Sequence, residues 1–341
     1  MINFLLFNEM IPDWMIRGEI RARLKKKLRG DYALSPADRK KKLLEWIEEM
    51  KQGPIALNTR DANEQHYEVP TTFFQCVLGK NLKYSSGFWQ YPYTTLDESE
   101  DAMLALTVER AQIQDGQKIL ELGCGWGSLT LYMAKKFPNA EITAVSNSKT
   151  QREHIEFQVQ RLGYKNVKVI TCDMNNLHLE EKFDRAISVE MFEHMRNYKT
   201  LLEKISGFLN AGGKLFVHVF AHKELSYPYI ASDPNDWIAK YFFTSGLMPC
   251  ANIFDYFQDH FRVAERWEIP GTHYQRTCRA WLELMDLGRI NVKIIFRETY
   301  GFKNTNKWWA YWRIFFMSCE ELFGFNNGKE WLVSHTLLEK K

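Results

Sequence analysis

Three side chains able to perform acid–base chemistry lie close together in the segment Glu190-Met-Phe-Glu-His-Met. Glu190 and His194 are four residues apart, and Glu193 lies three residues after Glu190. On a helical turn this spacing directs all three side chains into one pocket. A carboxylate attracts a cation, and a histidine with an ordinary pKa of about 6.5 can accept a proton at neutral pH. The alternative is a capping or salt-bridged cluster without a catalytic role.

A second group of candidate residues forms a glycine-rich turn directly after the apolar segment 118–122. Gly123, Gly125 and Gly127 alternate with other residues, and Ser128 stands at the third glycine site of the dinucleotide fingerprint. Glycines at such a turn let the backbone approach a ligand closely. The next apolar segment lacks the acidic residue at its end that a dinucleotide site uses. The pattern therefore favours a ligand other than a dinucleotide, or a tight turn without a ligand.

Apolar segments and helical patterns alternate regularly after residue 97, and this alternation predicts the frame that positions both groups. We expect strands at 118–122, 141–145, 167–172, 183–189 and 214–220, and helices from 97 onward and at 128–137, 149–162 and 198–209. Such alternation is typical of βαβ units in a doubly wound, mostly parallel α/β sheet. Ligands bind at the carboxyl ends of strands in these sheets, and both candidate groups follow strands.

Composition and charge exclude several classes of protein. The 341 residues are 45% hydrophobic and 26% charged, as in a globular protein with a large core. The net charge of +3 does not predict nucleic acid or an anionic membrane as the main partner. Six scattered cysteines without a CxxC pair argue against a disulfide framework and favour a cytoplasmic location. No segment approaches the ~20 apolar residues of a membrane span, so we expect no stable membrane insertion.

The first part of the chain differs in pattern from the alternating part. A basic amphipathic helix is expected at 15–28, and Ser35 followed by Pro36 predicts the start of a second helix. Residues 68–96 mix aromatic and turn residues and suggest a loop-rich lid. We therefore predict an N-terminal helical extension and lid over residues 1–96, a catalytic domain over 97–341, and a substrate-lid insertion at 223–255.

Several segments of the sequence resemble class I S-adenosylmethionine-dependent methyltransferases. More narrowly, they resemble the group of cyclopropane fatty acid synthases and plant coclaurine-type N-methyltransferases. The resemblance rests on Tyr84-Ser-Ser-Gly-Phe-Trp, Thr94-Thr-Leu-Asp-Glu-Ser-Glu, Glu121 to Gly127, Asn147-Ser-Lys-Thr-Gln, the Glu190 segment, Tyr311-Trp-Arg and Gly324-Phe-Asn-Asn-Gly-Lys-Glu-Trp. It extends from about residue 66 to the end, and the last segment is especially similar to the alkaloid N-methyltransferases. It implies a Rossmann-like fold with S-adenosylmethionine as cofactor.

The resemblance also implies which residues surround the cofactor. The methionine part would lie on the Gly123 and Gly125 backbone, and amide side chains would bind the ribose hydroxyls. An acidic residue would accept from the adenine amino group, and the N-terminal lid would close over the ligand. The implied residues are Tyr84, Ser85, Gly123, Gly125, Asn147, Gln151, Asp173 and Met174.

The implied reaction is methyl transfer to a small aromatic amine, either an arylalkylamine or an alkaloid-like primary or secondary amine. Glu190 would position the substrate and accept its proton, His194 would act as base, and Glu193 would orient the pair. Aromatic rings bind such cations by stacking and cation–π contact, and we expect Phe243 and Trp331 to contribute them. The sequence leaves open which amine is methylated and whether the enzyme forms a homodimer.

The competing hypothesis is methylation of a lipid double bond, as in the cyclopropane synthases. In those enzymes, bound bicarbonate removes the proton from the carbocation intermediate. Glu193, His218 and Tyr274 stand at places that match its ligands, but Ser86 stands where a cysteine is expected. Any of these residues would then contact the substrate side of the pocket. His218 and His222 are four residues apart but lack a third ligand with a recognisable spacing, so no metal is expected.

Overall fold

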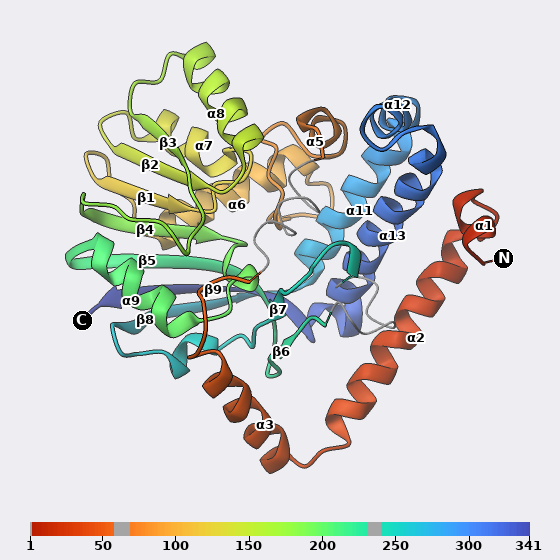
Figure 1. Ribbon diagram of the computed structural model, residues 1–341, viewed down its shortest axis with the longest axis horizontal. Helices are drawn as coiled ribbons and strands as arrows, with labels where there is room; N and C mark the ends of the chain where they lie inside the picture. Colours follow the sequence, from red (N-terminus) through yellow and green to blue (C-terminus); the bar gives the residue numbers. More distant parts are fainter. Residues whose placement is uncertain (1, 58–68, 231–239) are drawn as a thin grey trace.

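The computed structural model describes residues 2–57, 69–230 and 240–341 (Figure 1). Their central element is a seven-stranded sheet with the order β3-β2-β1-β4-β5-β9-β8. Helices cover both faces of this sheet, which confirms the predicted doubly wound α/β class. Within the described ranges, no helix is both long and apolar enough to cross a membrane.

Five strands of the sheet are parallel, and their positions agree with the sequence prediction. They are β1 (Lys118–Leu122), β2 (Glu141–Ser146), β3 (Val167–Thr171), β4 (Phe183–Val189) and β5 (Leu209–His222). Strand β9 (Trp331–Lys340) pairs antiparallel with β5 and with β8 (Phe261–Ile269). Strand β5 is longer than predicted because Leu209 still pairs with Phe183 of β4, while His222 still pairs with Trp331 of β9.

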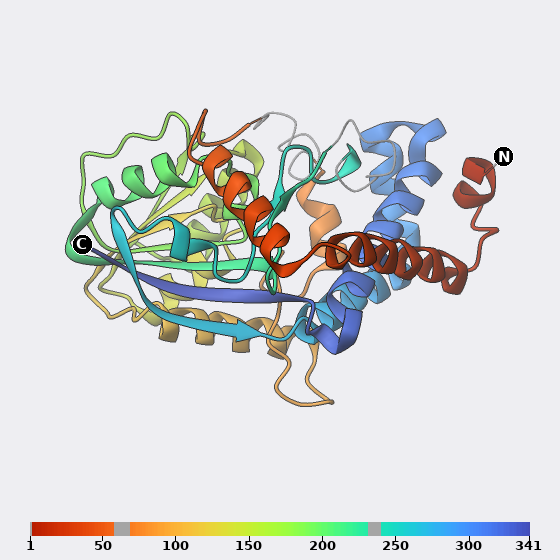
Figure 2. The same ribbon diagram turned by 90° about the horizontal axis from the view of Figure 1, so that it is seen from below.

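Helices lie on both faces of the sheet (Figure 2). Apolar side chains of the helices and strands pack together on each face. One face carries α6 (Leu96–Arg110), α7 (Ser128–Lys136) and α8 (Lys149–Leu162), packed on residues such as Ile119 and Ile142. The other face carries α3 (Pro36–Glu49) and α9 (Tyr198–Phe208), packed on residues such as Leu120 and Val217. Side-chain caps define where two of these helices begin. Ser35 caps α3, and Thr95 forms a capping box with Glu98 at the start of α6.

A helical layer brings the first helices of the chain together with α11, α12 and α13 beside the carboxyl ends of the parallel strands. It contains α1 (Ile2–Phe7), α2 (Asp13–Tyr32), α5 (Thr71–Val77), α11 (Thr272–Leu287), α12 (Arg289–Tyr300) and α13 (Thr305–Gly324). Their buried side chains form one core rich in aromatic rings. In the predicted 223–255 insertion, β6 (Tyr227–Pro228) pairs with β7 (Leu247–Met248), while 231–239 lie outside the described residues. Short 3₁₀ helices lie at Phe192–His194 (η1), Ile253–Tyr256 (η2), Phe302–Asn304 (η3) and Phe325–Gly328 (η4).

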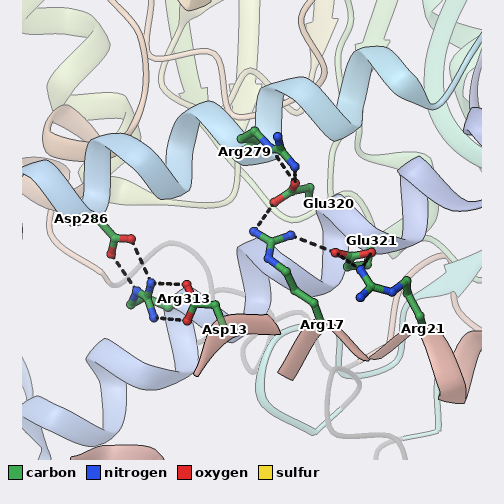
Figure 3. A network of polar contacts seen from close by, with 8 residues as sticks. All are labelled: Asp13, Arg17, Arg21, Arg279, Asp286, Arg313, Glu320 and Glu321. Atoms are coloured by element: carbon green, nitrogen blue, oxygen red, sulfur yellow. Dashed lines mark hydrogen bonds and ion pairs between the residues drawn. The ribbon is translucent and has the colours of Figure 1, made fainter. Parts of the chain in front are cut away.

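Ion pairs fasten α2 to α11 and α13 (Figure 3). The buried carboxylate of Glu320 on α13 pairs with Arg17 of α2 at 2.7 Å and with Arg279 of α11 at 2.6 Å. Arg313 of α13 pairs in the same way with Asp13 of α2 and Asp286 of α11. Charged pairs that are buried lose more when one partner is removed than exposed pairs do. The N-terminal extension is therefore fixed to the C-terminal helices and not only to its own neighbours.

We expect Glu320→Gln to lower the free energy of unfolding by about 2–3 kcal/mol, because two guanidinium groups lose a buried carboxylate. Urea denaturation followed by circular dichroism measures the change. Glu19→Gln is the matched control, since Glu19 pairs with Arg23 on the exposed surface of α2. Its expected loss is below ~0.5 kcal/mol. Equal losses in the two variants would show that the Glu320 network contributes no more than a surface pair.

Candidate active site

A cavity opens at the carboxyl ends of β1, β2 and β4, where the sheet rule places a ligand. It contains seven of the eight residues predicted to surround the cofactor, and it also contains Glu190 and His194. The seven are Tyr84, Ser85, Gly123, Gly125, Asn147, Gln151 and Met174. Their convergence on one cavity is an observation, and the individual contact of each with a ligand stays a prediction.

Asp173 differs from the other seven because it is not among the described residues that line the cavity. It lies between Cys172 and Met174, which do line it. One carboxylate oxygen, Oδ1, accepts a hydrogen bond from the backbone N–H of Asn175 at 2.7 Å. This local hydrogen bond engages Oδ1 and leaves Oδ2 open for the predicted contact with adenine.

The glycine turn has the shape that a closely held ligand requires. Gly125 has a φ of +51°, and no described atom lies within 4 Å of the position that a Cβ would take. Gly123 has a φ of +80°, and a Cβ there would lie 2.9 Å from Cβ of Met191. Both backbone conformations favour glycine. The open space beside Gly125 faces the cavity, so a side chain there would occupy room meant for a ligand.

Polar groups that line this cavity suit a ligand with hydroxyl and amino groups. Gln151 is buried, and its Oε1 accepts from the Ser146 hydroxyl at 2.7 Å. Among the described residues, nothing accepts a hydrogen bond from Nε2 of Gln151. Burial raises the pKa of Glu121, which also lines the cavity, to about 8, although the Thr130 hydroxyl donates to it. A buried donor without a partner is rare in proteins, which favours a ligand acceptor at Gln151.

A second cavity adjoins the first and is lined mainly by aromatic rings. Eight of its fourteen described lining residues are aromatic, among them Phe243, Tyr274 and Trp281. Tyr84, Glu190 and His194 line both cavities and form the boundary between them. A group bound in one cavity can therefore react with a group bound in the other only next to these three side chains.

The Glu190 carboxylate lies at this boundary and is held by donors from three separate elements. The Tyr274 hydroxyl of α11 donates to Oε2 at 2.6 Å. The backbone N–H of Ser86 donates to Oε1 at 3.2 Å, and Nε2 of His218 on β5 lies 3.3 Å from the same oxygen. Glu190 itself has a φ of +49°, which is strained for a residue with a side chain. The surrounding structure thus holds this side chain in one place against a backbone preference.

The two carboxyl groups of the segment differ in charge. Burial raises the pKa of Glu190 to about 7, against the opposing effects of the Tyr274 hydrogen bond and the Lys83 charge. Burial, followed by the charge of Glu190, raises the pKa of Glu193 well above its ordinary value. Among the described residues, Oε2 of Glu193 has no hydrogen-bond partner. Near neutral pH, Glu190 therefore exchanges protons readily, whereas the raised pKa of Glu193 favours its protonated form.

His194 differs from the sequence expectation in its protonation. Its ring stacks on Phe243 with a centroid distance of 5.0 Å and an interplanar angle of 12°. Burial lowers the pKa of His194 to about 4, against the opposing charge of Glu190. The imidazole is therefore neutral from pH 6 to pH 9 and does not lose a proton in the range where the sequence placed its titration. The pKa of Glu190, about 7, is therefore nearer to neutral pH than that of His194.

Trp331 requires a correction, because the structure places it outside both cavities. It is the first residue of β9 and is fully buried. Its indole N–H donates to the Tyr227 hydroxyl at 3.2 Å, and its ring packs edge-on against His222 and Phe325. We therefore replace the predicted substrate contact with a supporting role behind the cavity wall.

His218 and His222 also have defined partners. His218 faces Glu190, whereas His222 lies 3.2 Å from Glu330. Among the described residues, no cluster of three or more histidine, cysteine or acidic side chains is arranged to hold a metal ion. The two histidines thus contact different carboxyl groups.

Lys83 is a site residue that the sequence analysis missed. It is 2% exposed, lines the first cavity, and its ammonium donates to the Ser86 carbonyl at 2.8 Å and to the Ser85 hydroxyl. Burial lowers its pKa to about 8. A lysine before a tyrosine in a loop carries no periodic signal of burial. Only its position next to the predicted lid residues could have drawn attention to it.

Comparisons with known proteins agree with this geometry. Residues 56–329 match the family model described as mycolic acid cyclopropane synthetase. The chain is 40% identical to (S)-coclaurine N-methyltransferase of Papaver somniferum over 335 residues, which covers 97% of this chain and 95% of that protein. The chain belongs to the coclaurine N-methyltransferase family. A crystal structure of coclaurine N-methyltransferase bound to N-methylheliamine and SAH superimposes with a TM-score of 0.96, at 38% identity over 99% of both chains.

The lipid-modifying relatives are more distant from this N-methyltransferase. Cyclopropane-fatty-acyl-phospholipid synthase of Escherichia coli (strain K12) is 30% identical over 223 residues, which covers 64% of this chain and 55% of that protein. The coclaurine N-methyltransferases therefore share the N-terminal extension with this chain, whereas the bacterial synthase aligns over a shorter part. The family uses S-adenosylmethionine, and the open glycine turn and the free Gln151 donor fit that cofactor.

We expect Gly125→Val to abolish the binding of S-adenosylhomocysteine in isothermal titration calorimetry, because the new side chain would occupy ligand space. Gly163→Val is the matched control. Gly163 has a φ of +75° and equally open surroundings, but it ends α8 away from the cavity. Both variants bear a similar left-handed backbone penalty of roughly 1–2 kcal/mol, so their melting temperatures should fall similarly. Retained binding in Gly125→Val, or tight binding of NAD by the wild type, would contradict this assignment.

Proposed function

We propose that this N-methyltransferase methylates the nitrogen of a small aromatic amine, a primary or secondary arylalkylamine or alkaloid-like amine. Curated relatives named (S)-coclaurine N-methyltransferase and pavine N-methyltransferase support this substrate class. The solved relative bound to N-methylheliamine supports it as well. The observation that carries the proposal is the position of the Glu190 carboxylate.

Glu190 uses the donors that a bicarbonate site would need. The lipid hypothesis assigns Glu193, Tyr274, His218 and the lid residue Ser86 to bicarbonate. The last three of these contact Glu190 oxygens. The Ser86 hydroxyl donates to the Gly87 carbonyl and does not line either cavity. A carboxylate side chain thus stands in the place of a free anion. This arrangement favours an amine substrate, which carries its own proton to be removed.

The aromatic cavity suits an aromatic ammonium ion next to this carboxylate. Phe243, Tyr229 and Phe220 all line the cavity, and the Phe243 ring centroid lies 5.4 Å from that of Tyr229 and 5.6 Å from that of Phe220. Ring faces attract a cation by their quadrupole and stack on an aromatic substrate. Glu190 at the cavity boundary attracts the ammonium head, which orients the nitrogen toward the first cavity.

Proton removal must precede or accompany methyl transfer, because a protonated amine has no lone pair. S-adenosylmethionine, when bound, supplies a sulfonium methyl group that reacts with an in-line nucleophile. Glu190 accepts the amine proton, since a base with a pKa near the working pH is the most effective. His194 stays neutral and stacked on Phe243, where it limits the orientations open to the substrate. Protonated Glu193 adds no second negative charge to the pocket.

A cytoplasmic location fits the chemistry of the cysteines. All six are free thiols, and Cys124, Cys250 and Cys278 are buried. Free thiols persist in reducing compartments, whereas secreted proteins of this kind tend to form disulfides. We therefore infer that the enzyme works on amines present in the cytoplasm.

We expect Glu190→Gln to lower kcat/KM for the amine by ~10²–10⁴-fold, because the proton acceptor is lost. In the wild type, kcat/KM should rise with pH through about 7, where Glu190 becomes ionised, and this limb should disappear in the variant. Calorimetry should give nearly the same affinity for S-adenosylhomocysteine. Glu193→Gln is the matched control, and its loss should be much smaller because Glu193 is already protonated. Equal losses in both variants would remove the proposed role of Glu190.

Bicarbonate depletion distinguishes the amine from the lipid hypothesis. We expect methyl transfer from labelled cofactor to an amine panel to continue at an unchanged rate without bicarbonate, because Glu190 occupies the bicarbonate donors. Phospholipid vesicles should stay unlabelled, also in Ser86→Cys, which restores the residue expected in a cyclopropane synthase. Bicarbonate-dependent labelling of lipid, without turnover of any amine, would overturn the proposed substrate class and leave the fold and cofactor unchanged.

A further inference from the structure

Two buried histidines connect the Glu190 carboxylate to Arg110, at the end of α6. Nε2 of His218 lies 3.3 Å from Oε1 of Glu190, and Nδ1 of His218 lies 2.8 Å from Nε2 of His335. Nδ1 of His335 lies 2.9 Å from a guanidinium nitrogen of Arg110. Both imidazoles are fully buried, and the two histidines are direct register partners on β5 and β9. The four side chains form one continuous chain of hydrogen bonds.

The arginine gives this chain a direction. A guanidinium group has only donors and keeps its charge, so Nδ1 of His335 must accept from Arg110. A neutral imidazole has one donor and one acceptor, so His335 donates from Nε2 to Nδ1 of His218. His218 then carries its proton on Nε2, facing Glu190. Burial lowers the pKa of both histidines well below the usual range, which keeps them neutral.

Packing holds Arg110 and His335, the first two members of the hydrogen-bond chain, in place. The Arg110 guanidinium lies over the Trp267 ring, 4.9 Å from its centroid, and Trp267 on β8 is the register partner of His335. The Phe216 ring meets the His335 ring nearly edge-on, with centroids 5.0 Å apart. Aromatic contacts from β5 and β8 thus fix Arg110 and His335 from two sides.

We propose that Arg110 and His335 are positioning residues of the active site, which fix the His218 tautomer that donates a hydrogen bond to Glu190. This inference rests on the proposed function, in which Glu190 must be ionised to accept a proton. The chain is not an exit path for that proton, because an outward transfer would require the guanidinium to accept it. The proton on Glu190 therefore leaves through the cavity.

Other titratable groups also face Glu190, in addition to the hydrogen-bond chain from Arg110. They come from the lid segment, η1, β5 and α11, and they are Lys83, Glu193, His194, His218, Tyr274 and Cys278. Among the described residues in this group, only His218 is linked to Arg110 by hydrogen bonds, and the link runs through His335. A substitution of Arg110 thus changes the His218 donor and leaves the remaining groups in place.

The kinetic test uses Arg110→Met in the full-length enzyme. Without its fixed donor, His218 can turn its unprotonated nitrogen toward Glu190, which favours protonated Glu190. The acid limb of kcat/KM should therefore move to higher pH by about one unit, with an about 10-fold loss on the acid side and a smaller loss at pH 9. Arg110→Lys keeps a group that donates hydrogen bonds and accepts none. In this variant the acid limb should return most of the way to its wild-type pH. Calorimetric affinity for S-adenosylhomocysteine should stay the same in both variants.

Arg185→Met is the matched control for loss of a half-buried arginine. Arg185 donates to the backbone oxygens of Gln112 and Asp184 and has no link to the histidine chain. Its acid limb should coincide with that of the wild type. An unmoved limb in Arg110→Met, or the same shift in Arg185→Met, would overturn the proposal.

The spectroscopic test does not depend on turnover. In ¹⁵N-histidine-labelled protein, which has nine histidines, His218 and His335 should each carry the proton on Nε2. The signal that is lost in His335→Gln is that of His335. Arg110→Met should shift His218 toward the Nδ1–H form. A wild-type His218 with its proton on Nδ1 would overturn the proposal. Failure of the wild type to methylate any amine would instead contradict the proposed function, and the tautomer measurement would still decide this inference.

Discussion

An ionisable carboxylate inside a mainly apolar cavity is the constraint on which the active site depends. Burial alone would keep Glu190 protonated at neutral pH, because a charge in an apolar environment lacks hydration. Hydrogen bonds from Tyr274 and Ser86, together with the Lys83 charge, lower its pKa again toward neutrality, and His218 contacts the same carboxylate. Buried polar groups need such partners, and here none of them is a sequence neighbour of Glu190. The fold must therefore bring the lid, the sheet and the C-terminal helices to one point.

The helical layer explains how this convergence is maintained. Tyr274 reaches Glu190 from α11, and its ring stacks on Phe323 of α13 at a centroid distance of 4.3 Å. The same two helices are joined by Arg279 and Glu320, and Glu320 also pairs with Arg17 of α2. The N-terminal extension thus supports the orientation of a residue about 260 positions later in the chain.

The sequence predicted the parts of this site that follow from regular patterns. Alternation of strands and helices placed Gly125 and Glu190 at the same edge of the sheet, where both line the first cavity. It failed where tertiary packing decides the outcome. Trp331 has the residue type of a substrate contact, but its place at the start of β9 turns it into the core. The Phe243 ring and burial make His194 a weaker base than its residue type suggests, and no local pattern marks Lys83 as buried.

A carboxylate that belongs to the chain has different consequences from a bound anion at the same donors. A free anion can leave with its proton, whereas in the proposed mechanism Glu190 releases its proton before it accepts the next one. A pKa near neutrality suits this cycle, because a much lower value would weaken the base and a much higher value would hold the proton. The raised pKa of the neighbouring Glu193 favours its protonated form, so in the proposed mechanism the pair presents one negative charge to one ammonium. The hydrogen-bond donors around Glu190 therefore set both the substrate charge that the site attracts and the ease with which the site is regenerated.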